Sequence, residues 1–130
     1  MNRVVIGIGS NIRPEENIAR AREMIARSQY MLGESSFVET HPVGDENQPN
    51  FINGAILIET ALDSTELKEL LRGIEHDLGR NRGVPKDGPL TIDLDIVVWN
   101  GSVVDDDVHQ RDFLRDAVRE VWPELKVERA

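Results

Sequence analysis

The feature that most restricts the fold of this 130-residue chain is the order of its strand-like and helix-like segments. Runs rich in β-branched residues predict strands at 4–9, 35–40, 51–60 and 91–99, and apolar residues at three- and four-residue spacing predict helices at about 15–29, 63–78 and 112–121. Up to residue 99 this order is β-α-β-β-α-β, which is typical of the ferredoxin-like α+β sandwich, with helices packed on a mainly antiparallel sheet. The length suits one domain, so we expect 1–130 to form a single unit.

The second predicted helix has the clearest boundaries. Asp63 and Glu66 have capping-box spacing, and Gly79 stands where a helix commonly ends. The apolar stripe between these signals consists of Leu67, Leu70, Leu71, Ile74 and Leu78. The Gly- and Pro-rich stretch 83–89 that follows predicts a loop before the last strand.

Composition excludes several classes of partner. A formal charge of −9 disfavours nucleic acid, because such binding depends on neutralising phosphates with Lys and Arg. The apolar run 4–8 is too short for a membrane span, so we expect a cytoplasmic protein with no membrane partner, and a monomer acting on small molecules. Without cysteine, any metal must have oxygen or imidazole ligands.

Two carboxylates stand out in the last predicted strand. Asp93 and Asp95 share one face because side chains alternate along a strand, and their α-carbons are expected to lie about 6.6 Å apart. Asp is disfavoured in strands, and two hard oxygen ligands at this spacing favour Mg²⁺. A solvent-exposed strand face is the alternative, and the pattern by itself leaves both open. The run 105–107 is interpreted as a solvated acidic turn.

Basic and aromatic residues near this strand suggest a ligand site. Arg80 and Arg82 follow the second helix and offer guanidinium groups to phosphates, although they also suit the helix dipole. Phe51 and Asn53 project to one side of their strand, a pairing that suits a planar heterocycle or, alternatively, the protein core. The histidines have no metal-site spacing, and the serines lack a nucleophile setting.

Five segments together resemble the successive motifs of the hydroxymethyldihydropterin pyrophosphokinase family. They are Ile8-Gly9-Ser10-Asn11, Ser35-Ser36-Phe37 with Thr40-His41-Pro42-Val43-Gly44, Gln48 to Asn53, Ile74-Glu75 with Gly79-Arg80, and Gly88 to Ile96. Their order and spacing also agree with the family. The resemblance covers about residues 4–99 and becomes weak after Gly101.

The resemblance implies a pterin diphosphokinase that transfers pyrophosphate from ATP to 6-hydroxymethyl-7,8-dihydropterin with two Mg²⁺ ions. Asp93 and Asp95 would hold the ions and, with Arg80 and Arg82, form the catalytic set. The implied pterin-binding residues are Thr40, His41, Val43, Phe51, Asn53 and Phe113. The implied nucleotide-binding residues are Glu75, Arg80, Arg82 and Arg111.

Departures from the family pattern concentrate on the ATP side. Leu90 stands where the family carries a phosphate-binding Arg, and Asp87 where it carries a Trp. The 105–108 region lacks the family's Pro-His segment, and His109 is shifted. Two alternatives to an active enzyme therefore stay open: a catalytically impaired pterin- or nucleotide-binding module on the same fold, and an unrelated ferredoxin-like metal-binding domain.

Overall fold

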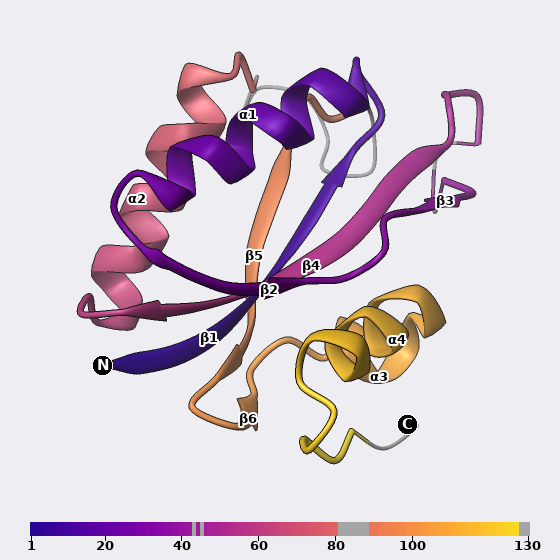
Figure 1. The fold of residues 1–130 in the computed structure, drawn as a ribbon. Coiled ribbons are helices and arrows are strands. Elements are labelled where there is room, and N and C mark those ends of the chain that lie inside the picture. Colours follow the sequence, from indigo (N-terminus) through magenta and orange to yellow (C-terminus); the bar gives the residue numbers. More distant parts are fainter. Residues whose placement is uncertain (43, 45, 81–88, 128–130) are drawn as a thin grey trace.

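A computed structural model describes residues 1–42, 44, 46–80 and 89–127. In it, helices lie on both faces of one sheet, with α1 and α2 on one face and α3 and α4 on the other (Figure 1). The elements are β1 (Asn2–Ser10), α1 (Pro14–Ala26), β2 (Tyr30–Glu34), β3 (Val38–Thr40), β4 (Phe51–Thr60), α2 (Ser64–Asp77), β5 (Asp93–Trp99), β6 (Ser102–Val103), α3 (Asp107–Gln110) and α4 (Asp112–Val121).

The sheet confirms the ferredoxin-like prediction. Its strands run in the order β2-β4-β1-β5-β6, every pair is antiparallel, and β3 pairs with the first residues of β4. The strands β1 and β4 therefore lie side by side in the centre of the sheet. This order is the one expected when each helix connects two strands that are separated by one other strand.

Strong local signals predicted their elements correctly. The bounds of β4 and α4 are those read from the sequence, and α2 begins with a complete capping box. In that box the Glu66 N–H donates to the Asp63 side chain over 2.8 Å, and the Asp63 N–H donates to Glu66 over 3.0 Å. Gly79 follows α2 with a positive φ of 88°, which explains why glycine stands there.

The region between α1 and β4 was predicted incorrectly. We expected one strand at 35–40, whereas the structure has β2 at Tyr30–Glu34 and a shorter β3 at Val38–Thr40. Ser35 interrupts the ladder: its backbone N–H still donates to the Ala55 carbonyl, but its hydroxyl accepts the Ala55 N–H. A side chain thus replaces a backbone group, and the two strands become separate.

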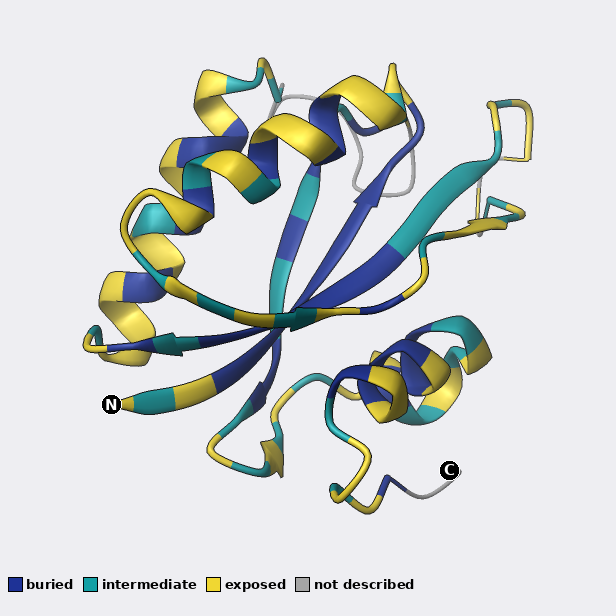
Figure 2. Ribbon diagram, in the orientation of Figure 1, coloured by how far each residue is buried: buried dark blue, intermediate teal, exposed yellow. Residues whose placement is uncertain are grey.

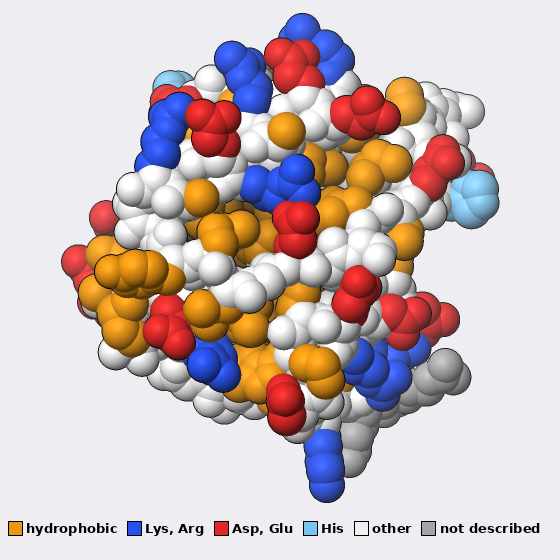
Figure 3. Space-filling view, in the orientation of Figure 1, with side chains coloured by type: hydrophobic (Ala, Val, Ile, Leu, Met, Phe, Trp, Pro, Cys, Tyr) orange, Lys and Arg blue, Asp and Glu red, His pale blue; other side chains and the backbone are white. Residues whose placement is uncertain are grey.

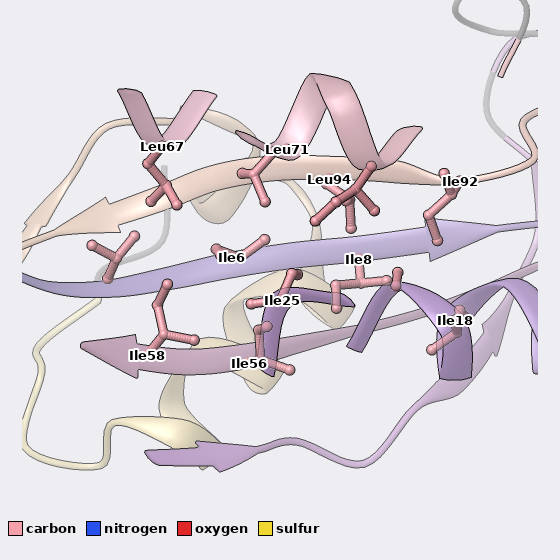
Figure 4. Packing of buried hydrophobic residues seen from close by; sticks show 13 residues of the cluster. Ile6, Ile8, Ile18, Ile25, Ile56, Ile58, Leu67, Leu71, Ile92 and Leu94 are labelled. Carbon is pink, nitrogen blue, oxygen red and sulfur yellow. The ribbon is translucent and has the colours of Figure 1, made fainter. Parts of the chain in front are cut away.

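An apolar core fills the space between the sheet and the pair α1 and α2 (Figure 4). Every second residue of β1 and β4 points into it, and both helices add a buried stripe. Its buried members are Val4, Ile6, Ile8, Ile18, Ala21, Ile25, Ile56, Ile58, Leu67, Leu71, Ile74, Ile92 and Leu94. Figure 2 shows the same division, with the sheet buried and the outer sides of the helices exposed.

A smaller core lies between the opposite face of the sheet and α4. Val5, Ala55 and Leu57 of the sheet meet Leu114 and Val118 of the helix there. This core covers only part of the face, because the alternate positions further along β1 and β5 are glycines and aspartates. The uncovered part is where the polar side chains gather.

One irregularity separates these two parts of β5. Val5 pairs with Val98, but the next residue, Ile6, pairs with Ile96, so Val97 is an extra residue in the ladder. Val97 and Val98 both join the core under α4, whereas Trp99 packs against the α1 and α2 core. The bulge thus reverses the alternation of side chains after the aspartates.

The surface carries both charged and apolar side chains. In Figure 3 hydrophobic side chains gather near the centre of the view, and acidic and basic side chains lie around and among them. The edge strand β2 contributes two exposed apolar residues, Tyr30 and Leu32. No helix within the described ranges has the length and apolar character needed to cross a membrane.

Candidate active site

The floor of the candidate site is a strip of sheet with no side chains on it. Gly9 pairs with Asn53 of β4 on one side and with Asp93 of β5 on the other. Gly7 stands in the same way between Ala55 and Asp95. A trough therefore runs along β1, with Asn53 and Ala55 on one flank and Asp93 and Asp95 on the other.

Gly9 is required by the close approach of Asn53. A β-carbon at position 9 would lie 2.4 Å from Oδ1 of Asn53, far inside contact distance. The amide is held over the trough because its Nδ2 donates to the Thr40 hydroxyl over 2.6 Å. The glycine thus lets β3 and β4 present an oriented amide on this face.

The prediction that Asp93 and Asp95 share one face is confirmed. Both pair with glycines of β1, and both border a hollow of about 100 Å³ under the start of α4. The other residues that line this small hollow are Gly7, Ile8, Gly9, Asn53, Gly54, Val97, Asp105, Asp107, Arg111, Phe113 and Leu114. The fold therefore brings an amide, an aromatic ring, a guanidinium group and two carboxylates from three distant parts of the chain to one place.

A larger hollow of about 520 Å³ lies on the α2 side of the same carboxylates. Its lining is Lys68, Leu71, Arg72, Glu75, Arg80, Asp93, Leu94, Asp95, Ile96, Val104, Asp105 and Asp106. Asp93, Asp95 and Asp105 border both hollows. These three side chains thus form the boundary between the two hollows. The small hollow is lined by the aromatic ring of Phe113, and the large hollow is lined by most of the basic side chains.

Arg80 is held inside the protein by two carboxylates. Its Nη1 lies 2.6 Å from Glu75 Oε2 and 2.9 Å from Asp93 Oδ1, and its side chain is 8% exposed. Glu75 also accepts the Leu94 N–H over 2.9 Å, which fixes α2 against β5. Arg80 and Glu75 border the large hollow, but in this structure they orient Asp93 rather than project toward a ligand.

Two buried residues that sequence reasoning treated only as part of a motif connect the loops around the site. The Asn11 side chain donates to Gln48 and to the Pro49 carbonyl, and accepts the Leu90 N–H. The Asn11 backbone N–H also donates to the Leu90 carbonyl, and the Ser10 hydroxyl donates to the Thr91 carbonyl. A buried Ser-Asn pair directly after an apolar strand was the available signal for this role.

The remaining predicted residues are distributed unevenly. Phe51 lies two residues before Asn53 on the same face of β4 and pairs with Thr40, while His41 is exposed beyond the end of β3. Asn53 lines the small hollow, whereas neither described hollow is lined by Phe51, Thr40 or His41. Val43 and Arg82, together with Asp87, lie outside the described residues.

Departures from the family pattern also have a structural counterpart. Leu90 is 6% exposed, and neither described hollow includes its side chain. His109 likewise borders neither hollow, and its carbonyl accepts a hydrogen bond from the buried Arg115. Asp105, which we had interpreted as part of a solvated turn, is half-buried beside the carboxylate pair.

The carboxylates suit a divalent cation that is shared with a substrate. No group of three or more His, Asp or Glu side chains able to hold a metal occurs within the described ranges. Mg²⁺ in phosphoryl-transfer sites usually has one or two protein carboxylates, and phosphate oxygens and water complete its shell. Asp93 and Asp95 meet that requirement, since both border the same two hollows.

The described residues form a ferredoxin-like α+β domain with a strand carboxylate pair between two hollows. Comparison with known families assigns this domain to a class. A model of the 7,8-dihydro-6-hydroxymethylpterin-pyrophosphokinase family matches residues 5–123. The chain belongs to this family.

Similar proteins in three bacteria bear the name 2-amino-4-hydroxy-6-hydroxymethyldihydropteridine pyrophosphokinase. The protein of Bacillus subtilis is 41% identical over 104 residues, which cover 77% of this chain and 62% of that protein. The protein of Haemophilus influenzae is 30% identical, with 92% of this chain and 81% of the relative covered. The protein of Methylorubrum extorquens is 33% identical, with 98% and 87% covered. The match to the Bacillus subtilis protein therefore spans less than two thirds of that relative.

Proposed function

We propose that this chain transfers pyrophosphate from ATP to 6-hydroxymethyl-7,8-dihydropterin, releasing AMP, in folate biosynthesis. The observation that carries the proposal is the position of Asp93 and Asp95 between the two hollows. Two substrates on either side of one carboxylate pair can bring a hydroxyl and a phosphate chain to the same point. The family and the names of the relatives supply the reaction.

The small hollow is the proposed pterin side. The Asn53 amide offers both a donor and an acceptor to a heterocycle, and Thr40 fixes its orientation. Phe113 borders the same hollow and offers a ring face for stacking, with Phe51 further along the face of β4. His41 and Val43 belong to this proposal through the family resemblance alone.

The large hollow is the proposed nucleotide side. Mg²⁺, proposed as two ions, would neutralise the phosphate oxygens next to Asp93 and Asp95. In the reaction the pterin hydroxyl oxygen forms a bond to the β-phosphorus of ATP, the bond from that phosphorus to the α-β bridging oxygen breaks, and the hydroxyl proton is released. The protein contributes orientation and charge, which is most of what such transfer requires. Glu75, Arg80, Arg82 and Arg111 are proposed for nucleotide binding: Glu75 and Arg80 border the large hollow, and Arg111 borders the small hollow on the other side of the carboxylates. Arg80 acts by orienting Asp93, and Arg82 belongs to this proposal through the family resemblance alone.

A binding module without turnover is the second candidate. It is favoured by Leu90, whose buried side chain provides no phosphate contact at a place where the family carries an arginine. Loss of one preorganised donor costs on the order of 10²- to 10³-fold in rate. In either case we propose a single domain that acts as a cytoplasmic monomer.

AMP formation from ATP, Mg²⁺ and the pterin separates the two candidates. The parent protein should form AMP only when all three are present, and Asp95→Asn should lower the rate on the order of 10³-fold. Asp116→Asn is the matched control, because Asp116 is an exposed residue of α4 outside both hollows. Tight pterin binding without AMP formation by the parent would reject the enzyme and leave the binding module.

A further inference from the structure

Most cationic side chains in the described part of the chain have a protein partner. The partnered side chains are Arg3, Arg13, Arg20, Arg22, Arg27, Arg80, Arg115 and Arg119. Among the described residues, Lys68, Arg72, Arg111 and Lys126 make no side-chain ion pair or hydrogen bond. Three of these four border the two hollows. The protein thus leaves its positive charge uncompensated mainly beside the carboxylate pair.

Two of these cations lie together on α2. Lys68 and Arg72 are one helical turn apart and share with Leu71 and Glu75 the side of α2 that borders the large hollow. Like charges at this spacing destabilise an isolated helix by about 0.2–0.5 kcal/mol. Helix stability therefore does not explain the pair, whereas an anionic ligand in the hollow does.

The other charges of the large hollow increase the need for these two cations. Arg80 is already paired with Glu75 and Asp93, so it adds little positive charge for a ligand. The remaining lining is acidic at Asp95, Asp105 and Asp106. A nucleoside triphosphate can approach such a surface only where cations or bound metal offset the carboxylates.

We propose that Lys68 and Arg72 bind the phosphate chain of the nucleoside triphosphate from the α2 side of the large hollow. Arg72 offers a planar fork that matches two phosphate oxygens, and Lys68 offers a mobile point charge one turn away. The pair supplies from a helix the positive charge that the chain lacks at buried Leu90. This assignment rests on the proposed function only for the identity of the nucleotide as ATP.

Direct binding of α,β-methylene-ATP with Mg²⁺, measured by calorimetry, tests the assignment without requiring turnover. Lys68→Met and Arg72→Met should each weaken nucleotide binding about 10- to 100-fold, as expected for one charge-assisted contact. Pterin affinity should change less than about twofold, because the pterin side lies across the carboxylates. Added salt should reduce the difference in nucleotide affinity between each variant and the parent, because salt screens charge interactions.

Lys126→Met is the matched control, since Lys126 is also unpartnered among the described residues and borders neither hollow. It should bind the nucleotide as the parent does. Nucleotide affinity within about twofold of the parent in both α2 variants overturns the assignment. An equal loss of nucleotide affinity in the Lys126 variant also overturns the assignment, because it would indicate a nonspecific effect of net charge.

The result is distinguishable from failure of the proposed function. Loss of nucleotide binding in the α2 variants of a parent that forms no AMP supports the phosphate site and rejects only the enzyme. A parent that forms AMP with α2 variants of unchanged nucleotide affinity supports the enzyme and rejects the phosphate site. Thermal unfolding of each variant, expected to match the parent, verifies that the fold is retained.

Discussion

The two faces of the sheet are built from the same strands but differ in what their side chains do. Toward α1 and α2, alternate residues such as Ile6 and Ile56 are fully buried and form a continuous apolar core. Toward α4, the neighbouring positions change along β1 from Val5 to Gly7 and Gly9, and the apolar contact ends. One face can therefore determine stability while the other is free to carry polar groups and the small hollow.

This division follows from the alternation of strand side chains. A carboxylate at position 93 or 95 points away from the main core without any change in backbone path. Removing side chains at Gly7 and Gly9 then opens space next to it. If this comparison is right, substitutions on the two faces should separate stability from ligand binding.

The largest effect on stability is expected at the centre of the main core. Ile56→Ala should lower the free energy of unfolding by about 3 kcal/mol, because Ile56 is fully buried and neighbouring side chains cannot fill the space. Urea unfolding measures this change. Leu32→Ala is the control: Leu32 is 45% exposed on the edge strand and should cost less than about 0.5 kcal/mol. A similar loss in both would contradict the assigned core.

The next largest effect is expected at Asn11, which connects the loops at the site end of the sheet. Asn11→Ala removes three side-chain hydrogen bonds, one of them from the buried Leu90 N–H, and should cost about 2–3 kcal/mol. It should also weaken the binding of both substrates, because the segments at Gln48–Pro49 and at Leu90 would no longer be held by the Asn11 side chain. Asn50→Ala, which removes one exposed bond to Glu39, is the matched change and should be nearly neutral. Equal stability of the two variants in urea would rule out the connecting role.

A residue at the edge of the small hollow should give an intermediate result. Leu114→Ala deletes as many carbons as Ile56→Ala, but Leu114 already borders the small hollow. The new space joins the hollow instead of forming a sealed cavity, so we expect a loss of about 2 kcal/mol together with weaker pterin binding. Unfolding and pterin titration of the same preparations compare the two faces directly. A greater loss of stability at Leu114 than at Ile56 would reverse the proposed division.

The smallest effect on stability, with a clear effect on binding, is expected at Gly9. Gly9→Ala forces the Asn53 amide to move, because the new β-carbon would lie 2.4 Å from its oxygen. We expect about tenfold weaker pterin binding and less than about 1 kcal/mol of destabilisation. Gly33→Ala on β2 is the control, since an added β-carbon there meets no atom within 4 Å. Unchanged pterin affinity in the Gly9 variant would remove Asn53 from the site.

The sequence predicted the parts of the fold whose signals are local. Ten apolar-rich residues before a turn predicted β4, and Asp63 with Glu66 predicted the start of α2. β2 was missed because Tyr30 to Glu34 is short and contains Gly33, and its strand character comes from pairing with β4. Residues distant in sequence determine that pairing, so no local pattern could indicate it.

The candidate site was predictable to a similar degree. The shared face of Asp93 and Asp95 follows from strand periodicity alone. The internal pairing of Arg80 and the position of Asp105 depend on how α2 and the segment after β6 meet β5, which the sequence does not reveal. Lys68 and Arg72 were overlooked for the same reason, because charged residues on a helix normally face solvent.

The bulge at Val97 has a consequence for how this strand tolerates changes in length. Deletion of Val97 would make the pairing of β5 with β1 regular, because Ile96 and Val98 would then be consecutive opposite Ile6 and Val5 while the aspartates and Trp99 keep their partners. Deletion of Leu94 would instead move one aspartate to the face of the main core. Position 97 is therefore a place where β5 can lose one residue while Asp93 and Asp95 stay opposite Gly9 and Gly7, and evolutionary changes in the length of this strand should concentrate there.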